Sequence, residues 1–209
     1  MQYIDFKNRV LMLINQYSVA SENIALSYNN QADYVLKIPG FLNSAQRYLA
    51  TTTAPIYATM HLDWDAAEQR DGFYIFTMPE DFWQMVGRGL PVMKNGEFKM
   101  YHRYRWMGRD QLVIPAKDRA PMEVHYHRYP VAIPNDPADD FELDNTPEAQ
   151  EAAAYYVAAY LAMFDNSFAY SALYNEFESR RQQMFERPQT EYDIVEDLYG
   201  TPGGGLYGV

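Results

Sequence analysis

The two residues of this chain with the clearest potential for chemistry are His125 and His127. They lie two positions apart in a predicted β-strand, so their imidazoles should share one face of a sheet. Two imidazoles on one face can begin a metal site, and His61, His102 or Glu123 could approach as a further ligand. Because no spacing in the sequence assigns a third ligand, an ordinary polar strand face is the favoured interpretation, and we predict no cofactor.

The remaining residues with catalytic potential form weaker patterns. The acidic pairs Asp63/Asp65 and Asp139-Asp140 are interpreted as solvated loop residues, because paired carboxylates act in catalysis only inside a pocket. The chain has no cysteine, which excludes disulfides, cysteine-based zinc sites and thiol catalysis. It also contains no phosphate-binding glycine loop, nucleophile elbow or dinucleotide fingerprint.

A segment rich in basic and aromatic residues could instead bind nucleic acid. Residues 97–106 are predicted to form one strand, and alternation divides their side chains between two faces, with Lys99, Tyr101, Arg103 and Arg105 on one and Met100, His102, Tyr104 and Trp106 on the other. A basic face with interleaved aromatic rings can bind single-stranded nucleic acid. Residues 55–135 carry 10 basic and 10 acidic side chains, however, so an acidic neighbouring subunit explains the same face without a net basic patch.

Aromatic residues are the most distinctive feature of the composition. The 209 residues include 19 Tyr, 11 Phe and 3 Trp, together with 11 Met. Tyrosine combines a large rigid ring with a polar hydroxyl and is enriched at protein interfaces. An aromatic-rich core would give the same composition, so both interpretations stay open at this point.

The net charge of −11 is unevenly distributed along the chain. Residues 136–209 carry 3 basic and 15 acidic side chains, whereas the rest of the chain is close to neutral. This distribution argues against a protein that coats nucleic acid with a basic face. The acidic last third could keep a surface away from DNA phosphates, face a basic partner or simply be solvated.

The hydrophobic pattern predicts an α+β fold. Residues 1–54 and 136–187 are predicted to form the body, a bundle of about four helices from both ends of the chain. Asp5 is expected to cap the first helix, and Pro39-Gly40 is expected to break or kink the second helical region. Thr146-Pro147 has the composition of a helix start, with a capping hydroxyl followed by proline.

Residues 55–135 are predicted to form a small antiparallel β domain inserted between the two halves of the bundle. We expect a meander of four or five strands, with a short helical turn beginning at Pro79. Asn95-Gly96 is a strong hairpin signal between two of these strands.

Residues 188–209 are predicted to form a flexible arm. The last ten residues are rich in glycine, and Leu206 and Tyr207 are apolar anchors that could order on a partner. The start of the chain lacks the basic and apolar regions of a signal peptide, and no stretch of about 18 apolar residues occurs. We therefore expect a soluble protein that is made inside the cell and has no membrane partner.

Several short runs, in their order along the chain, resemble the head–tail connector adaptor proteins of tailed bacteriophages. The runs are Asn43-Ser44-Ala45-Gln46-Arg47-Tyr48-Leu49-Ala50, Thr77-Met78-Pro79-Glu80-Asp81-Phe82-Trp83-Gln84, Val92-Met93-Lys94-Asn95-Gly96, Tyr104-Arg105-Trp106, Glu123-Val124-His125-Tyr126-His127-Arg128-Tyr129-Pro130, Ala153-Ala154-Tyr155-Tyr156-Val157-Ala158-Ala159-Tyr160-Leu161 and Tyr174-Asn175-Glu176-Phe177. The resemblance covers roughly residues 5–185 and does not extend to the arm.

The resemblance implies a structural role in the neck of a virion, in a protein made in the cytoplasm of the host bacterium. It implies no catalysis, so we predict that the protein is not an enzyme. Such adaptors assemble as a ring, usually of twelve copies, that joins the portal to the tail or nozzle protein. Double-stranded DNA passes through the bore during ejection and is retained after packaging, without sequence-specific binding. Three alternatives remain: a neck or tail-completion (nozzle) ring, a nucleic-acid-binding module, and an enzyme with a metal at the histidine pair.

The residues predicted to make partner or assembly contacts are mostly aromatic. They are Tyr48, Trp83, Arg103, Arg105, Tyr156, Tyr160, Tyr174, Leu206 and Tyr207. For Tyr48 and Tyr156, packing in the core is an equally good interpretation.

Overall fold

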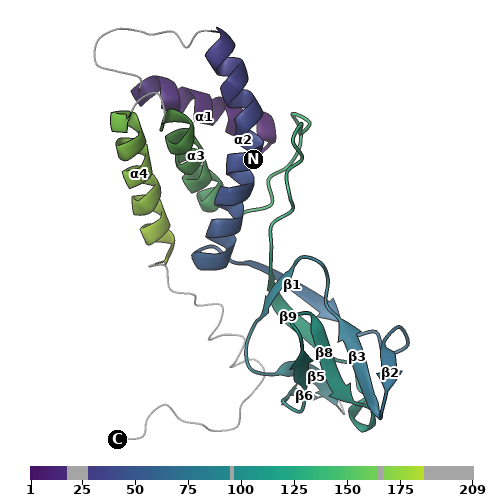
Figure 1. The fold of residues 1–209 in the computed structure, drawn as a ribbon. Helices are drawn as coiled ribbons and strands as arrows, with labels where there is room; N and C mark the ends of the chain where they lie inside the picture. Colours follow the sequence, from purple (N-terminus) through teal and green to yellow (C-terminus); the bar gives the residue numbers. More distant parts are fainter. Residues whose placement is uncertain (18–27, 95–96, 164–166, 186–209) are drawn as a thin grey trace, which may run out of the picture. The chain divides into compact units, whose positions relative to one another are not determined.

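The computed structural model of the chain describes residues 1–17, 28–94, 97–163 and 167–185 (Figure 1). The chain divides into two compact units. The helical unit combines Met1–Ile56 with Tyr129–Arg187, and the β unit contains Tyr57–Arg128. The prediction of an α+β fold, with helices from both chain ends and inserted antiparallel strands, is confirmed.

The helical unit has one hydrophobic core built around its third helix. Its helices are α1 (Tyr3–Tyr17), α2 (Tyr28–Thr52), α3 (Pro147–Ala162) and α4 (Ser167–Phe185). Alanines cover much of α3 and are buried almost all round, so α1, α2 and α4 can all pack closely against it. Figure 1 shows α3 between α2 and α4. Fully buried side chains from the four helices fill the core, among them Phe6, Leu13, Leu42, Leu173 and Phe177.

The start of α3 follows the prediction, whereas the cap predicted for the first helix is wrong. Thr146 caps α3 with a side-chain oxygen that accepts a hydrogen bond from the Ala149 amide at 3.3 Å, and Pro147 occupies the first turn. The first helix begins at Tyr3, so Asp5 lies inside its first turn instead of capping it.

The predicted break at Pro39-Gly40 is also wrong, because α2 runs through it without interruption. Proline removes one backbone donor from the helix and normally disrupts it. Here Ile38 and Leu42, on either side of the proline, are completely buried in the core of the helical unit. This apolar burial outweighs the local preference, since most helical stability in proteins comes from packing an apolar face. No helix among the described residues has the length and apolar character needed to cross a membrane.

The β unit contains nine strands within the described residues, arranged in three sheets. One sheet has the order β1-β9-β4, the second β2-β3-β8-β7, and β5 pairs with β6. Their bounds are β1 (Ile56–His61), β2 (Glu68–Arg70), β3 (Phe73–Thr77), β4 (Phe82–Met85), β5 (Leu90–Lys94), β6 (Glu97–Tyr101), β7 (Arg105–Met107), β8 (Gln111–Pro115) and β9 (Glu123–Arg128). A short 3₁₀ helix, Ala116–Asp118, follows β8. A separate core of buried side chains holds these sheets together, including Trp64, Phe76, Leu112, Ile114 and Val124.

The β unit differs from the predicted meander in strand number and in order. Two strands, β1 and β2, were not expected, and β9 pairs with β1 and β4 instead of with β8. The helical turn expected from Pro79 is a single turn, closed by the Phe82 amide donating to the Pro79 carbonyl at 2.9 Å. The chain then forms β4, because pairing with β9 lets Phe82 pack on the core of the β unit.

The hairpin signal at Asn95-Gly96 predicted the correct pair of strands. β5 and β6 pair antiparallel, and Lys94 lies opposite Glu97. The single strand predicted over residues 97–106 is wrong, because β6 ends at Tyr101 and β7 belongs to another sheet. The Tyr101 hydroxyl donates to the Arg103 carbonyl at 2.7 Å and stabilises the turn between the two strands.

Candidate assembly surface

Aromatic side chains from three helices of the helical unit form one continuous cluster, which we call the aromatic strip. Its members are Phe41 and Tyr48 on α2, Tyr156 and Tyr160 on α3, and Tyr170, Tyr174 and Phe177 on α4. Sequence separations of four and seven residues put the rings of each helix on one face, so each helix contributes a row of rings.

Short ring-to-ring distances link the rows across the helices. Tyr160 lies at the centre, with ring centroids 5.7 Å from Phe41, 4.5 Å from Tyr156 and 6.4 Å from Tyr174. Near the other end of the strip, Phe177 lies 6.1 Å from Tyr48 and 5.2 Å from Tyr156. These distances are typical of favourable aromatic pairs. The strip therefore connects α2 to α4 across α3.

The strip is buried on its inner side and accessible on its outer side. Phe177 is completely buried, the rings of Tyr156, Tyr160 and Tyr174 are half-buried, and Tyr48 is 38% exposed. Burial raises the pKa of the Tyr156 phenol, and its hydrogen bond with Tyr160 raises it further. Tyr156 is therefore neutral across the physiological range, with an apolar ring and a polar hydroxyl at the same surface.

A charged pair borders the strip at α4. The Arg181 guanidinium donates to the Glu178 carboxylate at 2.7 Å and lies 5.9 Å from the centre of the Tyr48 ring. Burial raises the pKa of the neighbouring Tyr174 phenol, and the Glu178 charge adds to that shift. The strip thus combines an apolar centre with a polar border, which is the usual arrangement of a protein–protein contact.

The structure brings together four of the predicted assembly residues and places the others elsewhere. Tyr48, Tyr156, Tyr160 and Tyr174 all lie in the aromatic strip. Trp83 is in the β unit, on β4, where its ring stacks on His127 with 6.0 Å between centroids. Leu206 and Tyr207 lie outside the described residues.

The predicted basic face does not form, because its residues belong to different segments. Arg105 is exposed on β7, with its guanidinium 4.8 Å from the centre of the Phe73 ring. Arg103 lies in the turn before β7, and its Nε is 4.0 Å from the Asp118 carboxylate. Lys99 is on β6, in another sheet. A row of basic and aromatic residues along one strand is therefore absent from this part of the described chain.

The histidine pair has two different environments. The Nε2 of His125 is 3.2 Å from Glu123, whose other oxygen is 3.2 Å from Nδ1 of His61. His127 instead packs its ring edge-on against Tyr57 at 4.8 Å. Burial lowers the pKa of His127. Across the described residues, no group of three or more histidine, cysteine or acidic side chains is arranged to hold a metal ion.

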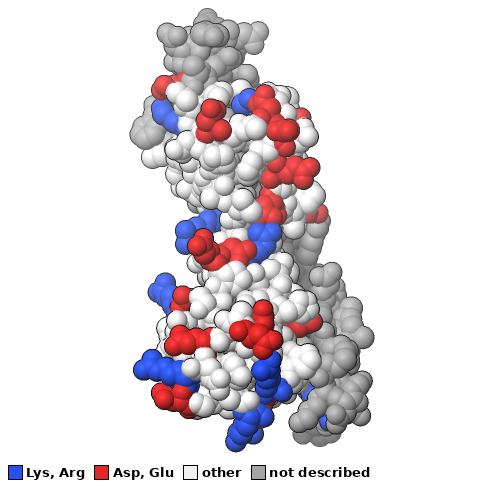
Figure 2. Space-filling model, turned by 90° about the vertical axis from the view of Figure 1, so that its right-hand side faces the viewer, with Lys and Arg blue, Asp and Glu red and all other residues white. Residues whose placement is uncertain are grey.

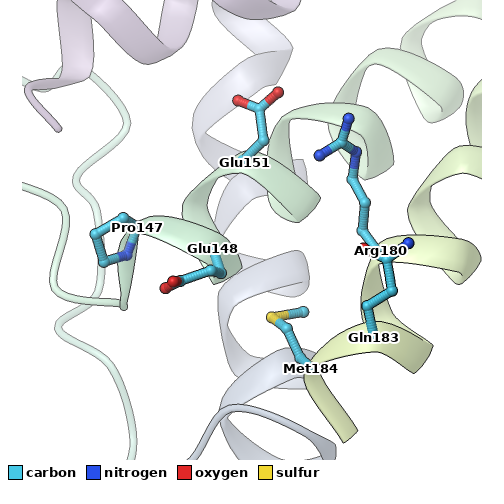
Figure 3. A pocket seen from close by; sticks show the side chains of 6 residues that line it. All are labelled: Pro147, Glu148, Glu151, Arg180, Gln183 and Met184. Atoms are coloured by element: carbon cyan, nitrogen blue, oxygen red, sulfur yellow. The ribbon is translucent and has the colours of Figure 1, made fainter. Parts of the chain in front are cut away.

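A cavity of about 380 Å³ lies where the first turn of α3 meets the end of α4. Figure 3 shows Glu148 and Glu151 from α3 beside Arg180 and Met184 from α4. Glu151 is already paired with Arg9 of α1 at 2.5 Å. Glu151 therefore links α3 to α1, and Arg180 links α4 to the Tyr155 hydroxyl of α3.

The network behind this cavity was not predicted from the sequence. Arg180 donates to the Tyr155 hydroxyl at 3.2 Å, and Arg9 reaches the same hydroxyl at 3.5 Å. Residues 9 and 155 lie on helices from opposite ends of the chain, and no short motif records such a pairing.

No protein-family model matches this chain, and no curated protein matches it.

Proposed function

We propose that this protein is a structural subunit of a bacteriophage neck, a head-to-tail adaptor that forms a ring of about twelve copies between the portal and the tail. In this role it is not an enzyme, it resides in the virion, and double-stranded DNA passes through its bore without sequence-specific binding. The order of elements along the sequence supports this proposal. Helices come from both chain ends, and the β unit is inserted between them in the sequence, as in the adaptors that the sequence resembles.

The aromatic strip is the single observation that carries the proposal. A ring needs side-to-side contacts between different faces of identical subunits. Tyrosine-rich surfaces suit such contacts, because the rigid rings lose little conformational entropy when they are buried. Tyr48 is the most exposed member of the strip at 38%, and elsewhere on the same unit Leu36 and Phe168 are 75% and 78% exposed.

The charge of the helical unit is compatible with a DNA channel. Exposed carboxylates concentrate in the segment between β9 and α3, at Asp136, Asp139, Asp140 and Glu142. On the face drawn in Figure 2, acidic side chains predominate over basic ones on the helical unit and are mixed with them on the β unit. An acidic wall repels phosphates, so DNA would slide past it instead of adhering.

The test is the assembly state of the full-length protein, alone and with the portal protein from the same genome. Native mass spectrometry and electron-microscope class averages should show rings, either of the protein itself or on assembled portal. The substitution Tyr48→Ser should weaken ring formation about tenfold, because it removes the most exposed ring of the aromatic strip.

The matched control is Tyr57→Ser, which removes an exposed tyrosine of the β unit that lies outside the strip. It should leave assembly unchanged. A protein that stays monomeric and binds no portal under any condition would overturn the proposal. Equal effects of the two substitutions would show that the strip is not the contact surface.

A further inference from the structure

The outer edge of β7 is a feature that the proposed function leaves unused. β7 pairs with β8 on one side, and no other strand among the described residues pairs with it. An unpaired edge presents backbone N–H and C=O groups that can pair with an additional strand. Such strand addition supplies affinity through the backbone and specificity through alternate side chains.

The two faces of this edge have opposite character. Arg105 is exposed on one face, and the nearby Arg103 side chain is 65% exposed, with Asp118 as its closest carboxylate at 4.0 Å. On the other face Trp106 is half-buried against the core of the β unit, and Tyr104 packs there as well. An added strand that fits this edge must therefore be acidic on one face and apolar on the other.

Residues 191–199 of this chain contain that pattern. Their sequence is Glu-Tyr-Asp-Ile-Val-Glu-Asp-Leu-Tyr, which contains no basic residue, glycine or proline. In an extended strand, alternation would place Glu191, Asp193, Val195, Asp197 and Tyr199 on one face and Tyr192, Ile194, Glu196 and Leu198 on the other. The division into an acidic and an apolar face is strict over residues 191–194, and both faces are mixed over residues 195–199. The composition also favours a strand, since four of the nine residues are tyrosine, isoleucine or valine.

We infer that residues 191–199 of one copy add as a strand to the β7 edge of a neighbouring copy. The acidic face of the segment pairs with Arg105 and Arg103, and its apolar face covers Trp106 and Tyr104. This inference rests on the self-association in the proposed function and names a second contact within it.

The other edge of the same sheet does not fit this occupant. All three side chains of β2 are exposed, so β2 offers no half-buried apolar face for Ile194 and Leu198. Its own charges are mixed, with Glu68 at one end and Arg70 beside Asp71 at the other. The combination of arginines with a half-buried tryptophan distinguishes β7.

The experiment uses the full-length protein and measures two quantities, hydrogen exchange of the β7 amides that point away from β8 and the self-association constant from sedimentation. We expect protection of these amides to increase with protein concentration. Arg105→Glu, and separately the pair E191R/D193R, should each lower the association constant about tenfold, because each reverses charge at the contact. Combining all three changes in one chain should restore association.

The matched control is Arg70→Glu, an exposed arginine on the opposite edge strand of the same sheet, which should change neither quantity. The inference would be overturned if the β7 amides that point away from β8 were unprotected at every concentration, or were protected equally at high dilution. Rings on portal with unprotected β7 amides would overturn it too and leave the proposed function standing. Protected β7 amides in a protein that does not bind the portal would support the strand addition and would contradict the proposed role in the phage neck.

Discussion

At the scale of single residues, tyrosine explains how the same aromatic side chains can pack against the core and remain partly exposed. Tyr156 and Tyr160 pack their rings with 4.5 Å between centroids, yet both stay half-buried. A phenylalanine in the same place would leave a purely apolar surface, whereas the phenol hydroxyl can be solvated before a partner arrives. The high tyrosine content therefore serves both the core and the surface. The two interpretations of the composition, an aromatic-rich core and an aromatic interface, do not exclude each other.

His127 gives a pH dependence whose sign follows from its environment. Burial lowers its pKa from the ordinary value of 6.5, and its buried Nε2 has no hydrogen-bond partner among the described residues. The unfolded chain therefore binds a proton more readily than the folded chain does. Stability should be complete above pH 6.5 and should decrease as the pH falls below it, until the folded form is protonated as well.

Urea unfolding of the full-length protein between pH 5 and 8 measures this effect. His127→Gln should reduce the loss of stability on the acid side, because glutamine does not titrate. His61→Gln is the control, since the side chain of His61 is 82% exposed. This substitution should leave the change of the free energy of unfolding with pH nearly the same. If the free energy of unfolding changed with pH in the same way in the wild type and in the His127 variant, His127 would not be the cause of the pH dependence.

At the scale of elements, α2 shows how burial of apolar side chains overrides the helix-breaking preference of Pro39-Gly40. The glycine at position 40 still costs helix stability. Gly40 lies inside α2 at an exposed position, and an added Cβ would meet no atom within 4 Å. Glycine in a helix interior costs about 0.5–1 kcal/mol relative to alanine. Gly40→Ala should therefore raise the free energy of unfolding by about that amount in a denaturant titration.

Gly108→Ala provides the opposite control for this prediction. Gly108 has a φ of 73°, a left-handed conformation that costs an L-residue roughly 1–2 kcal/mol. That variant should be destabilised while Gly40→Ala is stabilised. A loss of stability in Gly40→Ala would mean that α2 needs the flexibility of Pro39-Gly40.

The elements also show which features could be predicted from local sequence. The cap at Thr146 and the β5–β6 hairpin were predicted correctly because a few neighbouring residues determine them. Strand β4 and the separation of β6 from β7 were not, because they depend on pairing with distant strands. The same distinction holds in the aromatic strip. Spacing placed Tyr156 and Tyr160 on one face of a helix, but nothing local specified that Tyr48 would contact Phe177 of α4.

At the scale of the whole molecule, the chain builds two hydrophobic cores that share no buried residue. One core lies among the four helices and includes Leu42, and the other lies among the sheets and includes Leu112. Cooperative unfolding of two regions requires packed surface that both lose together. Separate cores therefore predict separate stabilities, which is useful in a subunit whose helical and β parts are proposed to make different contacts.

Core substitutions test this independence. Leu42→Ala and Leu112→Ala each remove a completely buried side chain and should cost about 2–5 kcal/mol in their own unit. Hydrogen exchange should accelerate in α2 and α3 for the first variant, and in β3 and β8 for the second, while the other unit keeps its wild-type protection. Loss of protection in both units from either substitution would show that they unfold as one. In that case the contacts proposed for the aromatic strip and for the β7 edge would be energetically coupled, and weakening one would weaken the other.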